Sequence, residues 1–126
     1  MERGAAAVEF ALVLPLLVLL VFGIVQFSIV YNRVQGLHAA AREGARIASL
    51  PQTTQSDINT RVMNALDGVV LAGPPTITVS PSTTQPCKDR SGQTVTVRVN
   101  ATTDINIPIW GSESMTLSGK GEFRCE

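Results

Sequence analysis

The sequence has little of what enzymes and nucleic-acid-binding proteins need. Ten acidic residues balance ten basic ones, so no net charge draws the chain to nucleic acid, and we expect no nucleic-acid partner. His38 is the only histidine. It adjoins a run of alanines, where a surface or subunit-packing role is more plausible than general-base catalysis. No metal-ligand cluster, G-x-S-x-G, dinucleotide-binding or P-loop pattern is present. The sequence therefore predicts a non-enzymatic protein with no cofactor and no metal.

Cysteine is also scarce. Cys87 and Cys125 are the only two, and they form no C-x-x-C motif. A widely separated pair beyond a membrane anchor favours an extracytoplasmic disulfide; the alternative is two buried thiols in a cytosolic domain. A bridge would close a loop of about 40 residues, which the chain-entropy description values at about 3 to 4 kcal/mol.

Charge is entirely missing from one long segment. Between Phe10 and Asn32 there are roughly 23 uncharged, mostly apolar residues, and a helix needs about 20 to cross a bilayer. A removable signal peptide is the rival interpretation, but its apolar core runs about 7 to 15 residues and ends at a small-residue cleavage site. We therefore expect a retained membrane helix spanning about residues 10–32 of the chain.

The orientation of this span is ambiguous from charge alone. Arg3 precedes it and Arg33, Arg42 and Arg46 follow it, so the positive-inside rule would keep the C-terminal part in the cytoplasm. The cysteine pair favours the opposite orientation. We follow the cysteines and expect the C-terminal part outside the cytoplasm.

The helix is expected to continue beyond the membrane. Small residues recur every fourth position and line one stripe that would let another helix approach closely, namely Gly36, Ala40, Gly44 and Ala48. Leu50 precedes a proline, which disfavours helical geometry. The pattern predicts one helix over residues 5–50.

The remaining residues predict a small α+β head over 51–126. A second helix fits Ser56 to Asp67, with Ser56 as N-cap and Gly68 as terminator. Its apolar face would comprise Ile58, Val62, Ala65, Leu66 and Val69. After it the hydrophobic period changes to two, which predicts an antiparallel sheet of three to four strands with one buried face. The expected strands are Thr76 to Ser80, Gln93 to Ala101, Asp104 to Ile109 and Ser114 to Cys125.

Two charged features stand out against this background. Glu9 sits at the edge of the apolar run, where an ionised group is costly; it either snorkels to the interface or has a specific partner. Arg42, Glu43 and Arg46 could form an ion-pair cluster on the helix surface, worth a few tenths of a kcal/mol.

The N-terminal residues carry a family resemblance. R-G-x-x-x-V-E-F-A-L-V-L-P-L-L occupies Arg3 to Leu17, A-A-R-E-G-A-R occupies Ala40 to Arg46, and a glycine-rich closing strand ends in Arg-x-Glu. The first pattern resembles the prepilin processing motif of the Flp (tight adherence, Tad) pilus system. Together the patterns are similar to the TadE-like pseudopilins, strongly over the first 50 residues and in outline beyond them.

The resemblance implies a processing site. Residues 1–4 would be a prepilin-type leader, cut after Gly4 by a membrane prepilin peptidase, with Phe10 completing the motif. Glu9 would pair with the new N-terminal amine of Ala5 on a neighbouring subunit, which offsets the cost of two unpaired charges in low dielectric.

The resemblance also implies partners and a location. The partners would be the lipid bilayer, other pilin or pseudopilin subunits, and Tad inner-membrane platform proteins. Arg42, Glu43 and Arg46 would contact partners. The chain would be a single-pass inner-membrane protein with a periplasmic or extracellular head, able to enter a pilus. It would act as a minor pilin in pilus assembly or initiation, and thereby in adhesion or secretion. The alternative is an unprocessed, statically anchored extracytoplasmic binding module.

Overall fold

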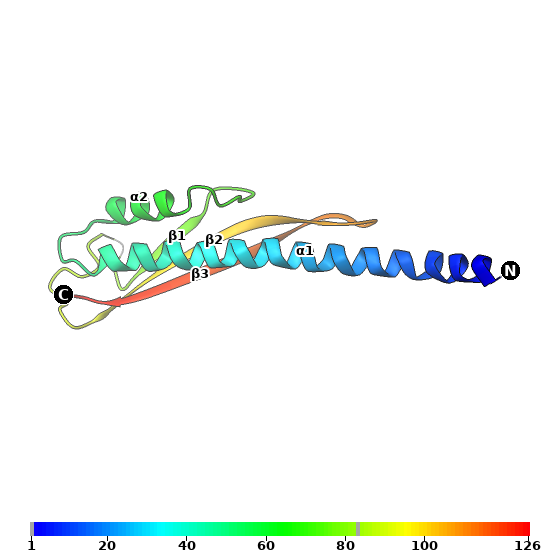
Figure 1. Cartoon of the computed structure of the whole chain (residues 1–126). Helices are drawn as coiled ribbons and strands as arrows, with labels where there is room; N and C mark the ends of the chain where they lie inside the picture. The colour runs from blue at the N-terminus through cyan, green and yellow to red at the C-terminus, as the bar shows by residue number, and fades with distance from the viewer. Residues whose placement is uncertain (1, 83) are drawn as a thin grey trace.

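The protein consists of one long helix with a small α+β head packed on its C-terminal half (Figure 1). This computed structural model describes residues 2–82 and 84–126; Met1 of the expected leader lies outside them. The helices are α1 (Glu2–Ala48) and α2 (Gln55–Ala65), and the strands are β1 (Thr76–Ser80), β2 (Thr94–Ile107) and β3 (Gly111–Arg124). The predicted α+β class and antiparallel sheet are confirmed, with three strands.

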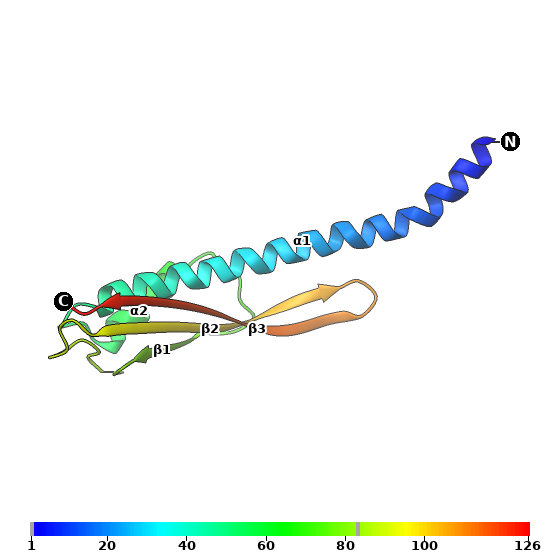
Figure 2. The ribbon, with the colours of Figure 1, turned by 90° about the horizontal axis from the view of Figure 1, so that it is seen from below.

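Helix α1 is continuous from the apolar segment into the head, as the sequence predicts. Pro15 lies inside it and cannot donate a backbone hydrogen bond to Ala11, which weakens the helix locally. Figure 2 shows the N-terminal turns bending away from the axis of the rest. At the other end the Ser49 hydroxyl donates to the Arg46 carbonyl (2.6 Å), and the Thr53 hydroxyl donates to the Ile47 carbonyl (2.6 Å). These bonds satisfy carbonyls that a helix end leaves without partners.

Helix α2 begins earlier than predicted, because its N-cap is Thr54, two residues before the expected Ser56. The Asp57 carboxylate accepts hydrogen bonds from the Thr54 backbone N–H (2.9 Å) and hydroxyl (2.7 Å). Thr54 and Asp57 thus form a capping box, for which Ser56 has no acidic residue at the right spacing. The same hydrogen bonds hold the pKa of Asp57 below its ordinary value. The helix ends at Ala65, and Gly68 follows with φ +87°.

The sheet has the order β1-β2-β3, and both pairings are antiparallel. The prediction of separate strands over Gln93 to Ala101 and Asp104 to Ile109 was wrong, because one strand runs through both. Its inward parity is unbroken: Val95, Val97, Val99, Ala101 and Thr103 are all buried. Thr103 holds an inward position because its hydroxyl accepts a hydrogen bond from Arg33 of α1.

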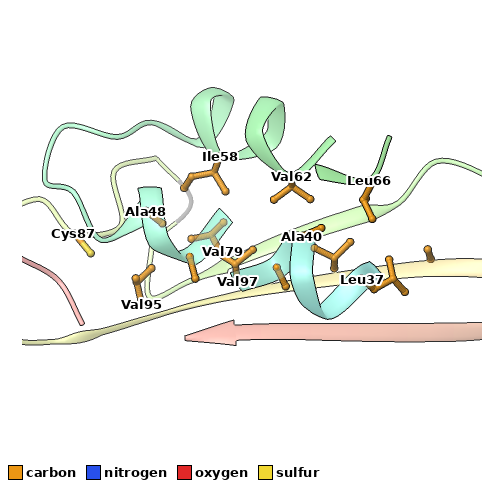
Figure 3. Packing of buried hydrophobic residues seen from close by; sticks show 14 of the residues in the cluster. Leu37, Ala40, Ala48, Ile58, Val62, Leu66, Val79, Cys87, Val95 and Val97 are labelled. Atoms are coloured by element: carbon orange, nitrogen blue, oxygen red, sulfur yellow. The ribbon is translucent and has the colours of Figure 1, made fainter. Parts of the chain in front are cut away.

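The core lies between α2, the C-terminal half of α1 and the inward face of the sheet. Figure 3 shows Ile58 and Val62 of α2 pointing toward α1 and the strands. Both are fully buried, as is Leu37 of α1. Of the face predicted for the second helix, Ala65 is exposed.

The C-terminus is fixed to the head by a disulfide between Cys87 and Cys125, whose Cα atoms are 5.4 Å apart. The Glu126 backbone N–H also donates to the Ser49 carbonyl at the end of α1 (3.0 Å). The closing strand and the end of α1 are therefore held together.

Candidate functional site

The expected processing segment occupies the first turns of α1. Gly4, Ala5, Glu9 and Phe10 are all helical and exposed. A Cβ added at Gly4 would meet no atom within 4 Å. The first turn of any helix leaves backbone N–H groups without intrahelical acceptors, so it opens more readily than the interior. The Gly4–Ala5 peptide bond is thus accessible at the end of the molecule farthest from the head (Figure 1).

Ala5 and Glu9 lie on the same face of the helix. Residues four apart stand one above the other, with Cβ atoms about 5 to 6 Å apart. A new amine at Ala5 would carry a positive charge about one turn from the Glu9 carboxylate.

The N-terminal half of α1 is apolar and uncovered. Every residue from Glu2 to Val25 is exposed, including large side chains such as Leu12 and Leu16. Phe27, just beyond this range, is exposed too. By length and composition this helix can cross a membrane. It is consistent with a single-pass anchor, because an apolar helix surface of this extent is not stable in water.

The head is held to α1 by an unusually close helix–strand contact. A Cβ added at Gly121 of β3 would stand 2.5 Å from the carbonyl carbon of Ala41, and one added at Gly119 would clash with the backbone of Leu37. Only glycine allows this approach. Sequence reasoning noted a glycine-rich strand but missed this role; the signal was two glycines at inward positions of a period-two pattern.

The stripe of small residues faces the chain's own head. A Cβ at Gly36 would come 2.9 Å from Val69, and one at Gly44 would come 2.5 Å from Val62 of α2. Ala40 and Ala48 are fully buried. The stripe thus does provide close packing, but its partners are α2, the segment that follows α2, and the sheet. The expected contact of this stripe with helices of other subunits has no support in the structure.

The charged residues between these alanines point the other way. Arg42 and Arg46 are exposed, whereas Glu43 is half-buried. Glu43 lies 3.5 Å from Arg46 and 3.7 Å from Arg61 of α2. Within the A-A-R-E-G-A-R segment, the small residues pack against the head, and Glu43 forms an ion pair with Arg61 of α2. Arg42 and Arg46 lie on the surface.

His38 also has a structural position. Its Nδ1 atom accepts a hydrogen bond from the backbone N–H of Lys120 (3.2 Å). Because β3 is an edge strand, this bond occupies a donor that would otherwise be open to another chain. The Lys120 ammonium lies 2.6 Å from Glu122, and this hydrogen bond and positive charge hold the pKa of the Glu122 carboxyl below its ordinary value.

Within residues 2–82 and 84–126, no group of three or more histidine, cysteine or acidic side chains could hold a metal ion. The features that the structure brings together are an exposed apolar helix with the Glu9 carboxylate near its N-terminal end, and a head packed against the opposite half of that helix.

Residues 4–46 match the model of a family described as TadE-like protein. No curated protein and no solved structure matches the chain. The matched range begins at Gly4 and ends at Arg46, so it spans the expected processing segment, the apolar part of α1 and the A-A-R-E-G-A-R segment.

Proposed function

We propose, from the match of residues 4–46 to the TadE-like family, that the chain is a minor pilin, or pseudopilin, of a Tad/Flp type IVb pilus. The match to this family supports an association with the Tad pilus and a structural rather than enzymatic role. The specific role proposed is in assembly or initiation of the pilus, and thereby in adhesion or secretion.

The observation that carries the proposal is the division of α1 into two halves. The head covers only the C-terminal half, where the buried positions run from Leu37 to Ala48. The other half is bare and apolar and ends in Gly4-Ala-Ala-Ala-Val-Glu9-Phe10. A helix built this way can stay in a bilayer or transfer into a bundle of similar helices, because both environments exclude water from the same surface.

The proposed maturation is a cut between Gly4 and Ala5 by a prepilin peptidase on the cytoplasmic side. The accessible Gly4–Ala5 bond supports this step. Glu9 would then pair with the amine of Ala5 on a neighbouring subunit, so that two charges otherwise costly in an apolar surrounding neutralise each other. The pairing would fix the register between subunits.

The head would stand on the periplasmic or outer side of the inner membrane. The Cys87–Cys125 disulfide supports this location, because such bonds persist in oxidising compartments. Arg42 and Arg46, exposed beside the head, would contact other pilin or pseudopilin subunits or the Tad platform proteins. Glu43 would hold Arg46 in position for that contact.

A Glu9→Gln variant tests the proposed docking role. Loss of pilus assembly with normal membrane insertion supports it, because glutamine keeps the shape and removes the charge. Glu2→Gln is the matched control, since Glu2 precedes the proposed cut and would be absent from the mature subunit. Equal assembly by the Glu9 variant and the wild type would instead favour a statically anchored binding module.

A further inference from the structure

The β2–β3 hairpin extends beyond the head along α1, toward its N-terminus (Figures 1 and 2). Its far end is not part of the core: every residue of β3 from Gly111 to Thr116 is exposed, and so are Asn106 and Ile107 of β2. The hairpin therefore projects two paired strands away from the hydrophobic centre that stabilises the head.

The tip of this hairpin, defined here as Ile107–Trp110, is apolar. Ile109 is 87% exposed and Trp110 is 79% exposed, the highest values among the exposed large hydrophobic side chains. No charge occurs between Asp104 and Glu113. Tips of surface hairpins are normally polar, so these side chains need a partner outside the described fold.

The turn at the tip holds Ile109 in an unfavourable backbone conformation. The Trp110 backbone N–H donates to the Ile107 carbonyl (3.2 Å), with Pro108 and Ile109 as the central residues. Ile109 has φ +81°, a value that type II turns usually assign to glycine or asparagine. A β-branched residue is a clear exception there. The exposed Ile109 side chain is therefore maintained against the preference of the turn.

The tip lies beside the apolar half of α1. Ile107, Pro108 and Trp110 face Leu19, Phe22 and Gly23 across a groove of about 200 Å³. Near its base, the hairpin is tied to α1 by Arg33, whose guanidinium donates to the Thr103 hydroxyl and approaches the Asp104 carbonyl at 3.5 Å. The hairpin is thus held along the helix, and its tip reaches the level of the membrane-spanning surface.

We propose that Ile107–Trp110 enters the outer interfacial layer of the lipid bilayer and forms a second membrane contact beside α1. Three features favour lipid over a protein partner. The tip continues the bare apolar surface of α1. Trp110 is of the residue type that prefers the membrane–water boundary. The carboxylates of Asp104 and Glu113 flank the tip, where they stay in water and limit insertion to a shallow depth.

This contact changes the expected position of the span. If the tip beside Leu19 to Gly23 is interfacial, residues 26–32 lie next to the hairpin and outside the hydrocarbon. The span then covers about residues 5–25, which is about 30 Å at 1.5 Å per residue and equals the thickness of the hydrocarbon core. The span predicted at 10–32 moves by one to two turns, and Glu9 lies deeper, where an unpaired carboxylate costs more.

Trp110 is the only tryptophan, so its fluorescence reports this site directly. The full chain is reconstituted in phosphatidylcholine vesicles whose acyl chains carry bromine either near the headgroup or near the methyl end. We expect a blue-shifted emission that shallow bromines quench more strongly than deep ones. Emission as in water, with no bromine quenching and full access to aqueous acrylamide, overturns the proposal. Shielding from both quenchers that fades on dilution with lipid also overturns it, because it indicates a second copy.

Ile109→Asp supplies the matched test. The added charge should leave roughly fivefold fewer tips in contact with lipid, seen as weaker quenching of Trp110 by shallow bromines. Met63→Asp is the control, because Met63 is an exposed hydrophobic residue of α2 and should leave the quenching unchanged. Equal quenching in both variants contradicts the proposal. Both variants alter surface residues, and retention of the Cys87–Cys125 bridge checks their folding. Neither result depends on processing or pilus assembly.

Discussion

The Cα atom of Gly121 faces the backbone of Ala41 so closely that a Cβ on the glycine would stand 2.5 Å from the alanine carbonyl. This contact and its neighbour at Gly119 place β3 directly against α1. They explain how a head with few large buried side chains stays fixed to a helix that presents mainly alanine and glycine to it.

Gly121→Ala should therefore destabilise the head by about 3 kcal/mol, because the α1 backbone at Ala41 and Arg42 leaves no room for the added methyl group. Denaturant unfolding followed by circular dichroism in detergent measures the change. Gly73→Ala is the control, since its Cβ would meet only the Thr102 hydroxyl at 3.8 Å. It should stay within about 0.5 kcal/mol of the wild type, and equal losses in the two variants would refute the close-contact explanation.

Ile109→Asn should raise stability by about 1 kcal/mol, because asparagine tolerates the positive φ that isoleucine resists. The same variant should reduce quenching of Trp110 by shallow bromolipids. Ile107→Asn changes a tip residue without a positive φ and should bring no gain in stability. If Ile109→Asn left stability and lipid contact both unchanged, the functional explanation of the strained turn would fail.

Most of α1 could be predicted from local sequence features, whereas its packing partners could not. The uncharged run and the small residues at every fourth position predicted α1 almost to its last turn, because helical periodicity is a local property. The stripe's partner could not be predicted, since whether Gly44 meets Val62 of this chain or a helix of another depends on the tertiary fold.

Two other features were visible but were not recognised. The odd-numbered positions of β2 are buried from Val95 to Thr103, and Ile105 is half-buried, so the alternation of one long strand was already present in the sequence. The predicted break between the two strands was wrong because threonine is not a typical core residue. The sequence alone does not reveal that Arg33 donates a hydrogen bond to the buried Thr103 hydroxyl. Thr54 and Asp57 likewise fit the capping-box spacing better than Ser56 does.

The capping box gives the head an acid-sensitive element. Hydrogen bonds from Thr54 lower the pKa of Asp57 in the folded protein. The ionised Asp57 therefore contributes to the free energy of unfolding above its unfolded pKa, and this contribution is lost as the pH falls through the lower, folded pKa. The stability of the folded head should thus decrease as the pH falls below about 4. Asp57→Asn should show a smaller drop over that window in thermal melts. Ser56→Ala, beside the cap, should retain the wild-type profile; if Asp57→Asn retained it too, the capping box would not be the source.

The disulfide should supply a large share of the head's stability. Cys87 and Cys125 are 38 residues apart, and closing a loop of that length is worth about 4 kcal/mol in the chain-entropy description. Cys87→Ser with Cys125→Ser should lower stability by about that amount in denaturant unfolding. Addition of a reductant to the wild type should have the same effect and none on the double variant. A wild type insensitive to reductant would contradict the account.

The central claim is that Gly4–Ala5 is cut and that Glu9 then finds a charged partner. Mass spectrometry of the intact protein, extracted from membranes of cells with an active prepilin peptidase, tests it most directly. The account predicts a mature chain that begins at Ala5 and an uncut chain in cells lacking the peptidase. A chain that still begins before Gly4 in both kinds of cell would contradict it.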